Sequence, residues 1–312
     1  HSQKSSKIWG KPLNMSDHPQ GWVDDPHKVE QVMNDLPHPI FSDVWQPIKE
    51  SGKGKKVLLY DIINKVCDKF PIRKQTIGDC VAQGAAYAVD AVKAVDIYIN
   101  GDFETWVAET ATEDIYAGSR VQIGGGGIRG DGSIGAWAAR YVNEYGALPR
   151  KKYGNIDLTK YSGDKARSWG RGSAGVPSSL IKIAKEHPIH TVSRVDTYEQ
   201  CRDLIANGYA ITIASMQGFS STRDEEGFAK PQGQWAHQMS ILGVDDEYKR
   251  PGVLVQNSWG VWNGGPKRHN QPDGSFWVDA EEIEKRILRK KDSWGFSGYE
   301  GFKPQKLNTR II

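Results

Sequence analysis

The chain has 312 residues, of which 38% are hydrophobic, so it can build one large domain or two lobes around a substantial core. Lys and Arg number 41 and Asp and Glu 38; this near balance, without a long basic stripe, argues against nucleic-acid binding. No run approaches the ~18 apolar residues of a membrane span, and the three cysteines, Cys67, Cys80 and Cys201, are too few for a disulfide framework.

The N-terminal residues lack the apolar core of a signal peptide, and the odd, low cysteine count favours a reducing compartment. We therefore expect a cytoplasmic or virion-associated protein that binds neither a membrane nor nucleic acid. No metal or other cofactor is expected, because the histidines near the chain ends are not spaced as metal ligands. Gly125, Gly127 and Gly130 match a dinucleotide-binding pattern, but no βαβ unit surrounds them, and we discard that interpretation.

Residues 1–55 are predicted to form an N-terminal arm. They are rich in Pro, His, Asp and Lys and show no sustained hydrophobic period, apart from one short helix expected over 26–36. The arm nevertheless carries Trp9, Trp22 and Trp45 and several large aliphatic residues. A disordered tail would usually contain fewer apolar groups. These side chains must be buried on the protein's own surface or against a partner subunit, and of these two the partner subunit is favoured.

Two helices are predicted in the first half of the chain, after a short strand over 57–60. The Ala- and Val-rich stretch 80–99 is apolar on most faces, which indicates a buried helix with Asp79 as its N-cap. A Gly-rich loop follows over 121–132, and Ser133 can then cap an amphipathic helix that Gly146 ends.

Strand signals dominate the second half. Residues 150–180 are Gly-, Ser- and Lys-rich and are predicted to be loop, and a helix with a capping box then runs from Thr197 to Gly208. Alternating and apolar runs predict four strands, over 209–215, 237–245, 252–259 and 275–280. A last short helix is predicted over 281–289. Helices in the first half and strands in the second indicate an α+β protein with two lobes.

Cys80, His237 and Asn257 form a pattern suited to covalent acyl transfer. Cys80 is at the predicted start of a helix, where the helix dipole lowers a thiol pKa and favours the nucleophilic thiolate. His237 opens a strand-like run and can serve as a base near neutral pH, and Asn257 ends another and can orient the imidazole. Taken singly, each residue would more often be an ordinary core, strand or turn residue.

Together with Gln75 and the run Asn257-Ser258-Trp259-Gly260, this order of Cys, His and Asn resembles the papain-like cysteine proteases over about residues 60–290. The resemblance implies a helical first lobe over about 75–165 and an antiparallel, β-barrel-like second lobe over about 185–290, with the active-site cleft between them. The catalytic domain would span 56–300, followed by a C-terminal tail over 301–312. No cofactor is implied.

The resemblance also implies a role for each site residue. Cys80 would be the nucleophile and His237 the general base and acid, oriented by Asn257, while Trp259 would shield that contact from water. Gln75 and the backbone N–H of Cys80 would form the oxyanion hole. An extended peptide or protein substrate would lie across the cleft, contacting Trp259 and pairing with three glycines of the Gly-rich loop: Gly126, Gly127 and Gly130.

The chain departs from the family pattern close to the nucleophile. Gln75 is one residue closer to the cysteine than is usual, Asp79 stands where a small residue is common, Val81 replaces an aromatic residue, and Gln238 follows the histidine. These departures indicate a divergent bacterial or phage-type member. They leave a second interpretation open, in which the fold serves as a structural or assembly protein, such as a virion component, with weak or no protease activity. The family also adds a third position for the arm, across the cleft as a pro-segment, which we rank last because the family's pro-regions are mainly helical.

Overall fold

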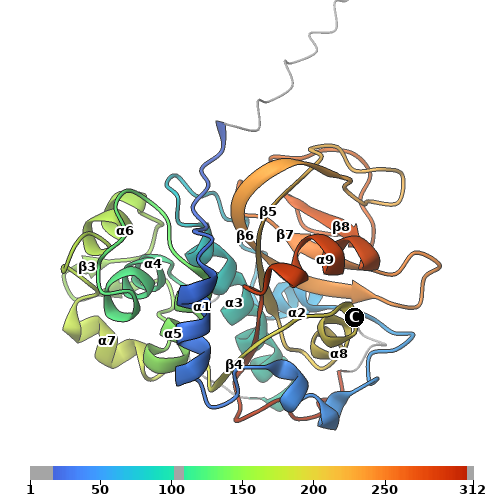
Figure 1. Cartoon of the computed structure of the whole chain (residues 1–312), viewed down its shortest axis with the longest axis horizontal. Coiled ribbons are helices and arrows are strands. Elements are labelled where there is room, and N and C mark those ends of the chain that lie inside the picture. Colours follow the sequence, from blue (N-terminus) through green and yellow to red (C-terminus); the bar gives the residue numbers. More distant parts are fainter. Residues whose placement is uncertain (1–16, 102–108, 308–312) are drawn as a thin grey trace, which may run out of the picture.

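The Ala- and Val-rich stretch forms the helix α3, Cys80–Asn100, which lies between a helical lobe and a β lobe (Figure 1). The structure is a computed structural model that describes residues 17–101 and 109–307. α3 packs against the strand β6, Pro231–Asp245, and against α2, Leu59–Val66. Gly84 permits the close approach to β6, because a Cβ there would lie 3.1 Å from both Gln238 Cγ and the Met239 carbonyl oxygen.

The helical lobe follows α3 in the chain and gathers on one side of it (Figure 1). Its elements are α4 (Glu113–Gly118), a π-helical turn (Ser119–Ile123), α5 (Gly135–Tyr145), the short strands β2 (Lys152–Tyr153) and β3 (Ile156–Asp157), α6 (Gly163–Trp169) and α7 (Ser178–Ala184). α5 is the amphipathic helix that the sequence predicts, and Gly146 ends it with a φ of 79°.

The β lobe is a seven-stranded antiparallel sheet with the order β4-β9-β5-β6-β7-β8, to which β1 adds by pairing with β6. The other strands are β1 (Lys56–Leu58), β4 (Thr191–Arg194), β5 (Ile211–Phe219), β7 (Gly252–Gln256), β8 (Ser275–Asp279) and β9 (Trp294–Ser297). The helices α8 (Tyr198–Ala206) and α9 (Ala280–Arg286) and a 3-10 turn (Leu288–Lys290) belong to the same lobe. This confirms the α+β class.

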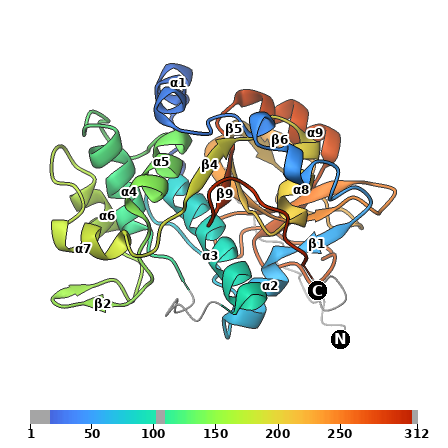
Figure 2. The ribbon, with the colours of Figure 1, turned by 90° about the horizontal axis from the view of Figure 1, so that it is seen from below.

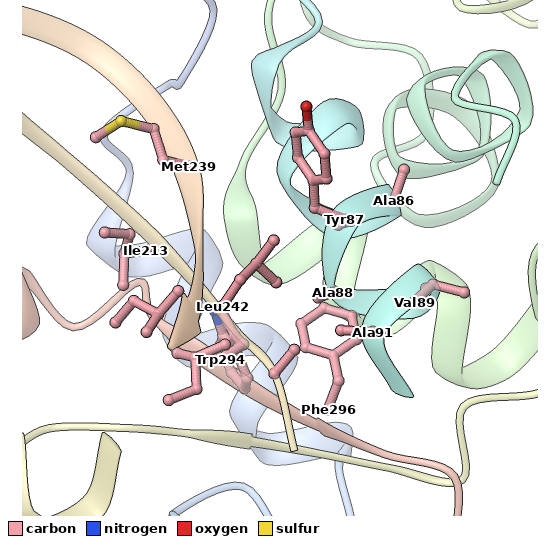
Figure 3. Packing of buried hydrophobic residues seen from close by; sticks show 14 of the residues in the cluster. Ala86, Tyr87, Ala88, Val89, Ala91, Ile213, Met239, Leu242, Trp294 and Phe296 are labelled. Atoms are coloured by element: carbon pink, nitrogen blue, oxygen red, sulfur yellow. The ribbon is translucent and has the colours of Figure 1, made fainter. Parts of the chain in front are cut away.

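The main core lies where α3 meets the sheet (Figure 3). Small residues of α3 face large apolar residues of the strands, and all of them are almost fully buried: Ala88, Ala91, Ile213, Leu242, Trp294 and Phe296. Alanines on the helix leave room for the bulky strand residues, so the helix and the sheet pack closely against each other. The nucleophile candidate at the start of α3 is thereby fixed relative to β6. Among the described residues, no helix is both long and apolar enough to cross a membrane.

Several sequence predictions differ from the structure. The run expected as a strand over 57–60 turns into α2 after Leu58. The segment 150–180, expected as loop, contains β2, β3, α6 and the first residues of α7. Asp79 occupies the N-cap position of α3, but its carboxylate does not cap the helix. Ser133 does not cap α5 either; the N–H of Gly135 donates instead to Asp292, 157 residues away in sequence. A local sequence pattern cannot reveal a cap supplied from so far along the chain.

The described part of the arm packs on the chain's own lobes. α1, Pro26–Asp35, lies against α5 (Figure 2), and two 3-10 turns follow over Phe41–Asp43 and Gln46–Ile48. Trp22, Phe41 and other apolar arm residues are buried within the same molecule, contrary to the partner subunit that the sequence favoured. Trp9 lies outside the described residues. Phe41 also packs edge-on against Phe302, so the tail residues 301–307 join the same core.

We expect Phe41→Ala to lower the free energy of unfolding by about 3–5 kcal/mol, because Phe41 is fully buried and contacts Trp45 and Phe302. Val261→Ala serves as the control, since Val261 is 69% exposed and should change stability by less than about 0.5 kcal/mol. Urea denaturation measures both values. Equal stability of the two variants would mean that the arm is not part of the folded core in solution.

Candidate active site

Cys80 is the first residue of α3, and its side chain is fully buried. Backbone N–H groups of Gln238, Gly21 and Val81 point at its sulfur and favour the thiolate. Burial has the larger effect, however, and raises the pKa of the thiol to about 12. The lowered pKa that the helix position predicts is therefore wrong for this arrangement, because water has no access to the sulfur.

His237 lies on β6 opposite Ser215 of β5, and its ring is fixed by Asn257, which directly follows β7. His237 Nε2 and Asn257 Oδ1 are 2.7 Å apart. Asn257 Oδ1 also accepts the N–H of Ser258 at 2.6 Å, so the amide oxygen is held in place from two directions. His237 and Gln238 are adjacent on β6. The imidazole therefore lies next to the residue whose backbone N–H points at the Cys80 sulfur.

The other ring nitrogen of the imidazole, His237 Nδ1, is buried and has no hydrogen-bond partner among the described residues. Trp259 covers the ring, with 4.4 Å between the two ring centroids. Burial is the main reason why the pKa of His237 is lowered to about 4. The imidazole is thus neutral near pH 7, with one nitrogen engaged by Asn257 and one available to accept a proton.

Gln75 reaches the same place despite its shortened spacing from the cysteine. Its Oε1 accepts from Ser258 Oγ at 2.6 Å, and its backbone N–H donates to the Ser258 carbonyl at 2.9 Å. Its Nε2 donates to the Ile77 carbonyl at 2.9 Å and to the Pro19 carbonyl at 3.2 Å. The amide is therefore anchored on its oxygen side and turns its N–H group towards a peptide carbonyl of another segment.

That segment comprises residues 18–23 of the arm, which we call the strap. In Figure 1 it descends between the two lobes before it enters α1. The His18 ring stacks on Trp259 with 4.7 Å between centroids. The Pro19 carbonyl accepts from Trp259 Nε1 at 2.9 Å as well as from Gln75 Nε2. A peptide group of the chain itself thus occupies the donors at Gln75 and Trp259.

The middle of the strap is bonded through its backbone to both lobes. The N–H groups of Gly21 and Trp22 donate to the Ala236 carbonyl at 3.1 and 3.0 Å. On the opposite side, Ser133 N–H donates to the Gly21 carbonyl and the Ser133 carbonyl accepts from Val23 N–H, both at 2.9 Å. The strap is therefore an extended strand held between β6 and the segment that leads into α5.

Gly21 and Gly78 let the strap lie directly on the backbone before Cys80. A Cβ on Gly21 would lie 2.0 Å from the Gly78 carbonyl oxygen, and a Cβ on Gly78 would lie 2.3 Å from the Gln20 carbonyl oxygen. Neither backbone can move aside without breaking the hydrogen bonds around it. The strap is thus in contact with the nucleophile candidate and separates it from solvent.

The glycines predicted to bind substrate lie further back along the loop. A Cβ on Gly126 would meet the Gly172 carbonyl within the helical lobe, and Gly127 and Gly130 have no atom within 4 Å of an added Cβ. Gly132 and Ser133 are the loop residues that meet the strap. Ser133 was expected as a helix cap, and nothing in the sequence marks it as a backbone-pairing residue.

Asp79 is fully buried beside Cys80, where the resemblance puts a small residue. Its Oδ2 accepts from Gln83 Nε2 and Tyr161 OH, both at 2.9 Å, while Oδ1 has no hydrogen-bond partner among the described residues. Burial is the main cause that raises the pKa of Asp79 to about 7. The carboxyl group therefore carries less than a full negative charge next to the thiol at neutral pH.

No protein-family model and no curated protein matches this sequence. Solved structures do match it. Xylellain, a cysteine protease from Xylella fastidiosa, is 18% identical with a TM-score of 0.54, over 91% of this chain and 97% of its own. The proform of the ragweed pollen cysteine protease Amb a 11 is 17% identical with a TM-score of 0.52, over 81% of this chain and 61% of its own. At such identities the likeness concerns the fold, and by that measure this chain has the fold of the papain-like cysteine proteases.

Proposed function

We propose that this chain is a cysteine peptidase with Cys80 as nucleophile, His237 as general base and acid, Asn257 as the group that orients His237, and Gln75 at the oxyanion. The observation that carries the proposal is the His237–Asn257 contact of 2.7 Å, which leaves Nδ1 without a hydrogen-bond partner among the described residues. The next residue of β6, Gln238, points its backbone N–H at the Cys80 sulfur. An imidazole fixed at one nitrogen and free at the other is what a thiol nucleophile requires of its base. The fold of the neighbours supports peptide-bond hydrolysis in general.

The proposed reaction has two halves. His237 Nδ1 takes the thiol proton, and the thiolate attacks the substrate carbonyl carbon while Gln75 Nε2 and the Cys80 N–H donate to the developing oxyanion. The peptide C–N bond breaks as the proton passes from His237 to the leaving amine, which leaves a thioester on Cys80. His237 then takes a proton from water, the hydroxide attacks the thioester, and the acid product leaves as the proton returns to the sulfur.

The closed strap is not arranged as a substrate. It points the N–H of Gly21 at the Cys80 sulfur, whereas attack requires a carbonyl carbon there. The strap also fills the Gln75 and Trp259 donors with the Pro19 carbonyl. Substrate must therefore displace the strap before the proposed reaction begins, and the burial that makes both thiol and imidazole neutral ends at the same moment.

The four site residues should differ in their effects on turnover. Cys80→Ala and His237→Ala are expected to abolish peptide hydrolysis, and Asn257→Ala to weaken it less, because Asn257 orients the base and exchanges no proton. Gln75→Ala should lower kcat by ~10²-fold through loss of an oxyanion donor. Gln31→Ala on α1 is the control and should leave the rate unchanged. A normal rate for Gln75→Ala would contradict a role at the oxyanion and would leave the side chain with only its hydrogen bonds to Ser258 and to the strap.

Opening the strap should expose the thiol. In Gly21→Ala the new Cβ would lie 2.0 Å from the Gly78 carbonyl oxygen, so the strap must lift. We expect iodoacetamide to alkylate Cys80 at least ~10-fold faster at pH 7.5, and the midpoint of the rate against pH to fall from about 12, since burial no longer opposes the thiolate.

Gly264→Ala is the matched control for this experiment, because a Cβ there has no atom within 4 Å. Peptide mapping by mass spectrometry identifies the labelled cysteine. Cys67 and Cys201 are buried as well, and burial raises the pKa of each. Faster labelling of either of them than of Cys80 in Gly21→Ala would contradict the assignment of the nucleophile.

The buried thiol gives a specific reason to retain the second interpretation, a structural or assembly protein with weak or no protease activity. A fully buried Cys80 with a raised pKa, covered by the chain's own backbone, is also what an inactive module would show. Gly21→Ala separates the two functions. A peptidase gains turnover together with thiol labelling, whereas a structural module gains labelling alone.

A further inference from the structure

Trp22 is the only residue of the strap whose side chain is buried, with 4% of its surface exposed. The backbone on either side of it pairs with Ser133, through the Gly21 carbonyl and the Val23 N–H. The side chain of Trp22 leaves this pairing for the interior, where its Nε1 donates to Asp292 Oδ2 at 2.7 Å. We call the place that the indole ring occupies the indole site.

Asp292 closes the inner end of the indole site. It lies just before β9, is 1% exposed, and accepts from Gly135 N–H at 2.9 Å and from Trp294 Nε1 at 2.8 Å in addition to Trp22. Gly135 is the first residue of α5, so the carboxylate faces the positive end of that helix. Burial is nevertheless the largest effect on Asp292, and it raises the pKa of the carboxyl group.

A second acceptor lies on the same side of Gly135. A Cβ built there would lie 2.6 Å from Gln238 Oε1 and 2.7 Å from Asp292 Oδ2. Gln238 is fully buried, its Nε2 is engaged by the Val81 carbonyl, and its Oε1 has no hydrogen-bond partner among the described residues. The inner end of the indole site therefore presents two acceptors, Asp292 Oδ2 and Gln238 Oε1.

The strap binds the space beside Cys80 through backbone groups that any extended peptide possesses. Its partners there are the Ala236 carbonyl and both backbone groups of Ser133. A substrate that bonds to these same backbone groups, even with its reacting carbonyl placed differently from the strap, would direct one of its side chains into the indole site. Sequence discrimination at this position depends on what Asp292 accepts.

We propose that Asp292 determines substrate specificity: the indole site is a substrate side-chain pocket that Trp22 fills in the closed chain, and it selects peptides with an N–H donor side chain, tryptophan above all. This inference rests on the proposed peptidase function. Phenylalanine fills the apolar part of the site but leaves one acceptor of a buried carboxylate unpaired, which is unfavourable. Arginine supplies donors, but its guanidinium must also give up its water to enter a site in which burial already opposes charge on Asp292.

The test uses the full chain with Trp22→Ala, which vacates the indole site. Capped peptides with the strap sequence His-Pro-Gln-Gly-Trp-Val, and versions with Phe or Arg in place of Trp, are titrated as protectors of Cys80 against iodoacetamide. We expect the Trp peptide to bind about tenfold more tightly than the Phe and Arg peptides, the loss of one hydrogen bond to a charged group. Adding Asp292→Asn should reduce the Trp-over-Phe preference to less than about threefold.

Protection of Cys80 needs no turnover, so the pocket and the peptidase function fail separately. Selective protection by the Trp peptide, without hydrolysis of any Trp-containing peptide, would contradict the peptidase function and support the indole site as a side-chain pocket. Equal protection by the Trp and Phe peptides, or a preference that Asp292→Asn leaves unchanged, would contradict the proposal that Asp292 selects substrate side chains. Asp292 would then serve only as a cap for α5. If Asp292→Asn does not fold, as judged by melting, the three peptides on the Trp22→Ala chain still decide. In an active enzyme, kcat/KM for matched substrates should follow the same order.

Discussion

The contact between α3 and β6 determines the geometry of the whole site. Gly84 lets the helix lie against the strand, and Gln238 ties the two together by donating from Nε2 to the Val81 carbonyl at 2.8 Å. The backbone N–H of the same residue points at the Cys80 sulfur, and His237 precedes it on the strand. One helix–strand contact therefore positions both the nucleophile candidate and the candidate base, although they lie 157 residues apart in sequence. Larger side chains at position 84 would separate them.

Burial has opposite effects on the site's geometry and on its chemistry. It holds the His237–Asn257 contact away from competing water, and it also removes the solvation that a thiolate and an imidazolium need. In the closed chain both groups are neutral, with pKa values displaced in opposite directions, to about 12 for Cys80 and about 4 for His237. Burial by the strap opposes the ionisation of both groups, so we expect ionisation to become more favourable when the strap leaves. The strap thus controls the protonation state as well as access.

The sequence predicted positions that depend on a local pattern. Cys80 begins a helix and Asn257 follows a strand, as expected, and the fold class followed from the segregation of helices and strands. It was uninformative where the structure joins distant segments. Asp292 caps α5 and binds Trp22 across 270 residues, and no periodicity links those positions. Ser133 acts through its backbone, which leaves no compositional signal at all.

Asp79 illustrates how a correct position can carry a wrong role. The residue stands at the N-cap of α3 as predicted, yet its carboxylate turns away from the helix end and accepts from Gln83 and Tyr161 instead. Tyr161 lies in the loop before α6, a helix that the sequence did not predict. The sequence around Asp79 therefore could not reveal that Tyr161 would bind its carboxylate.

In the proposed peptidase, the covalent link between the strap and the candidate active site would decide how strongly the strap competes with substrate. A segment joined to the body through α1 returns to its site at an effective concentration in the millimolar range for a short flexible connection. Backbone pairing alone contributes to every extended peptide equally, so it gives the strap no advantage over substrate beyond this proximity. The Trp22–Asp292 hydrogen bond is the additional interaction, and it is buried where water cannot compete for it. A substrate lacking an equivalent donor must overcome both proximity and that bond, whereas one that carries it must overcome proximity alone. In the proposed peptidase, Trp22 would therefore both hold the strap in place and compete with the side chain of each substrate for Asp292.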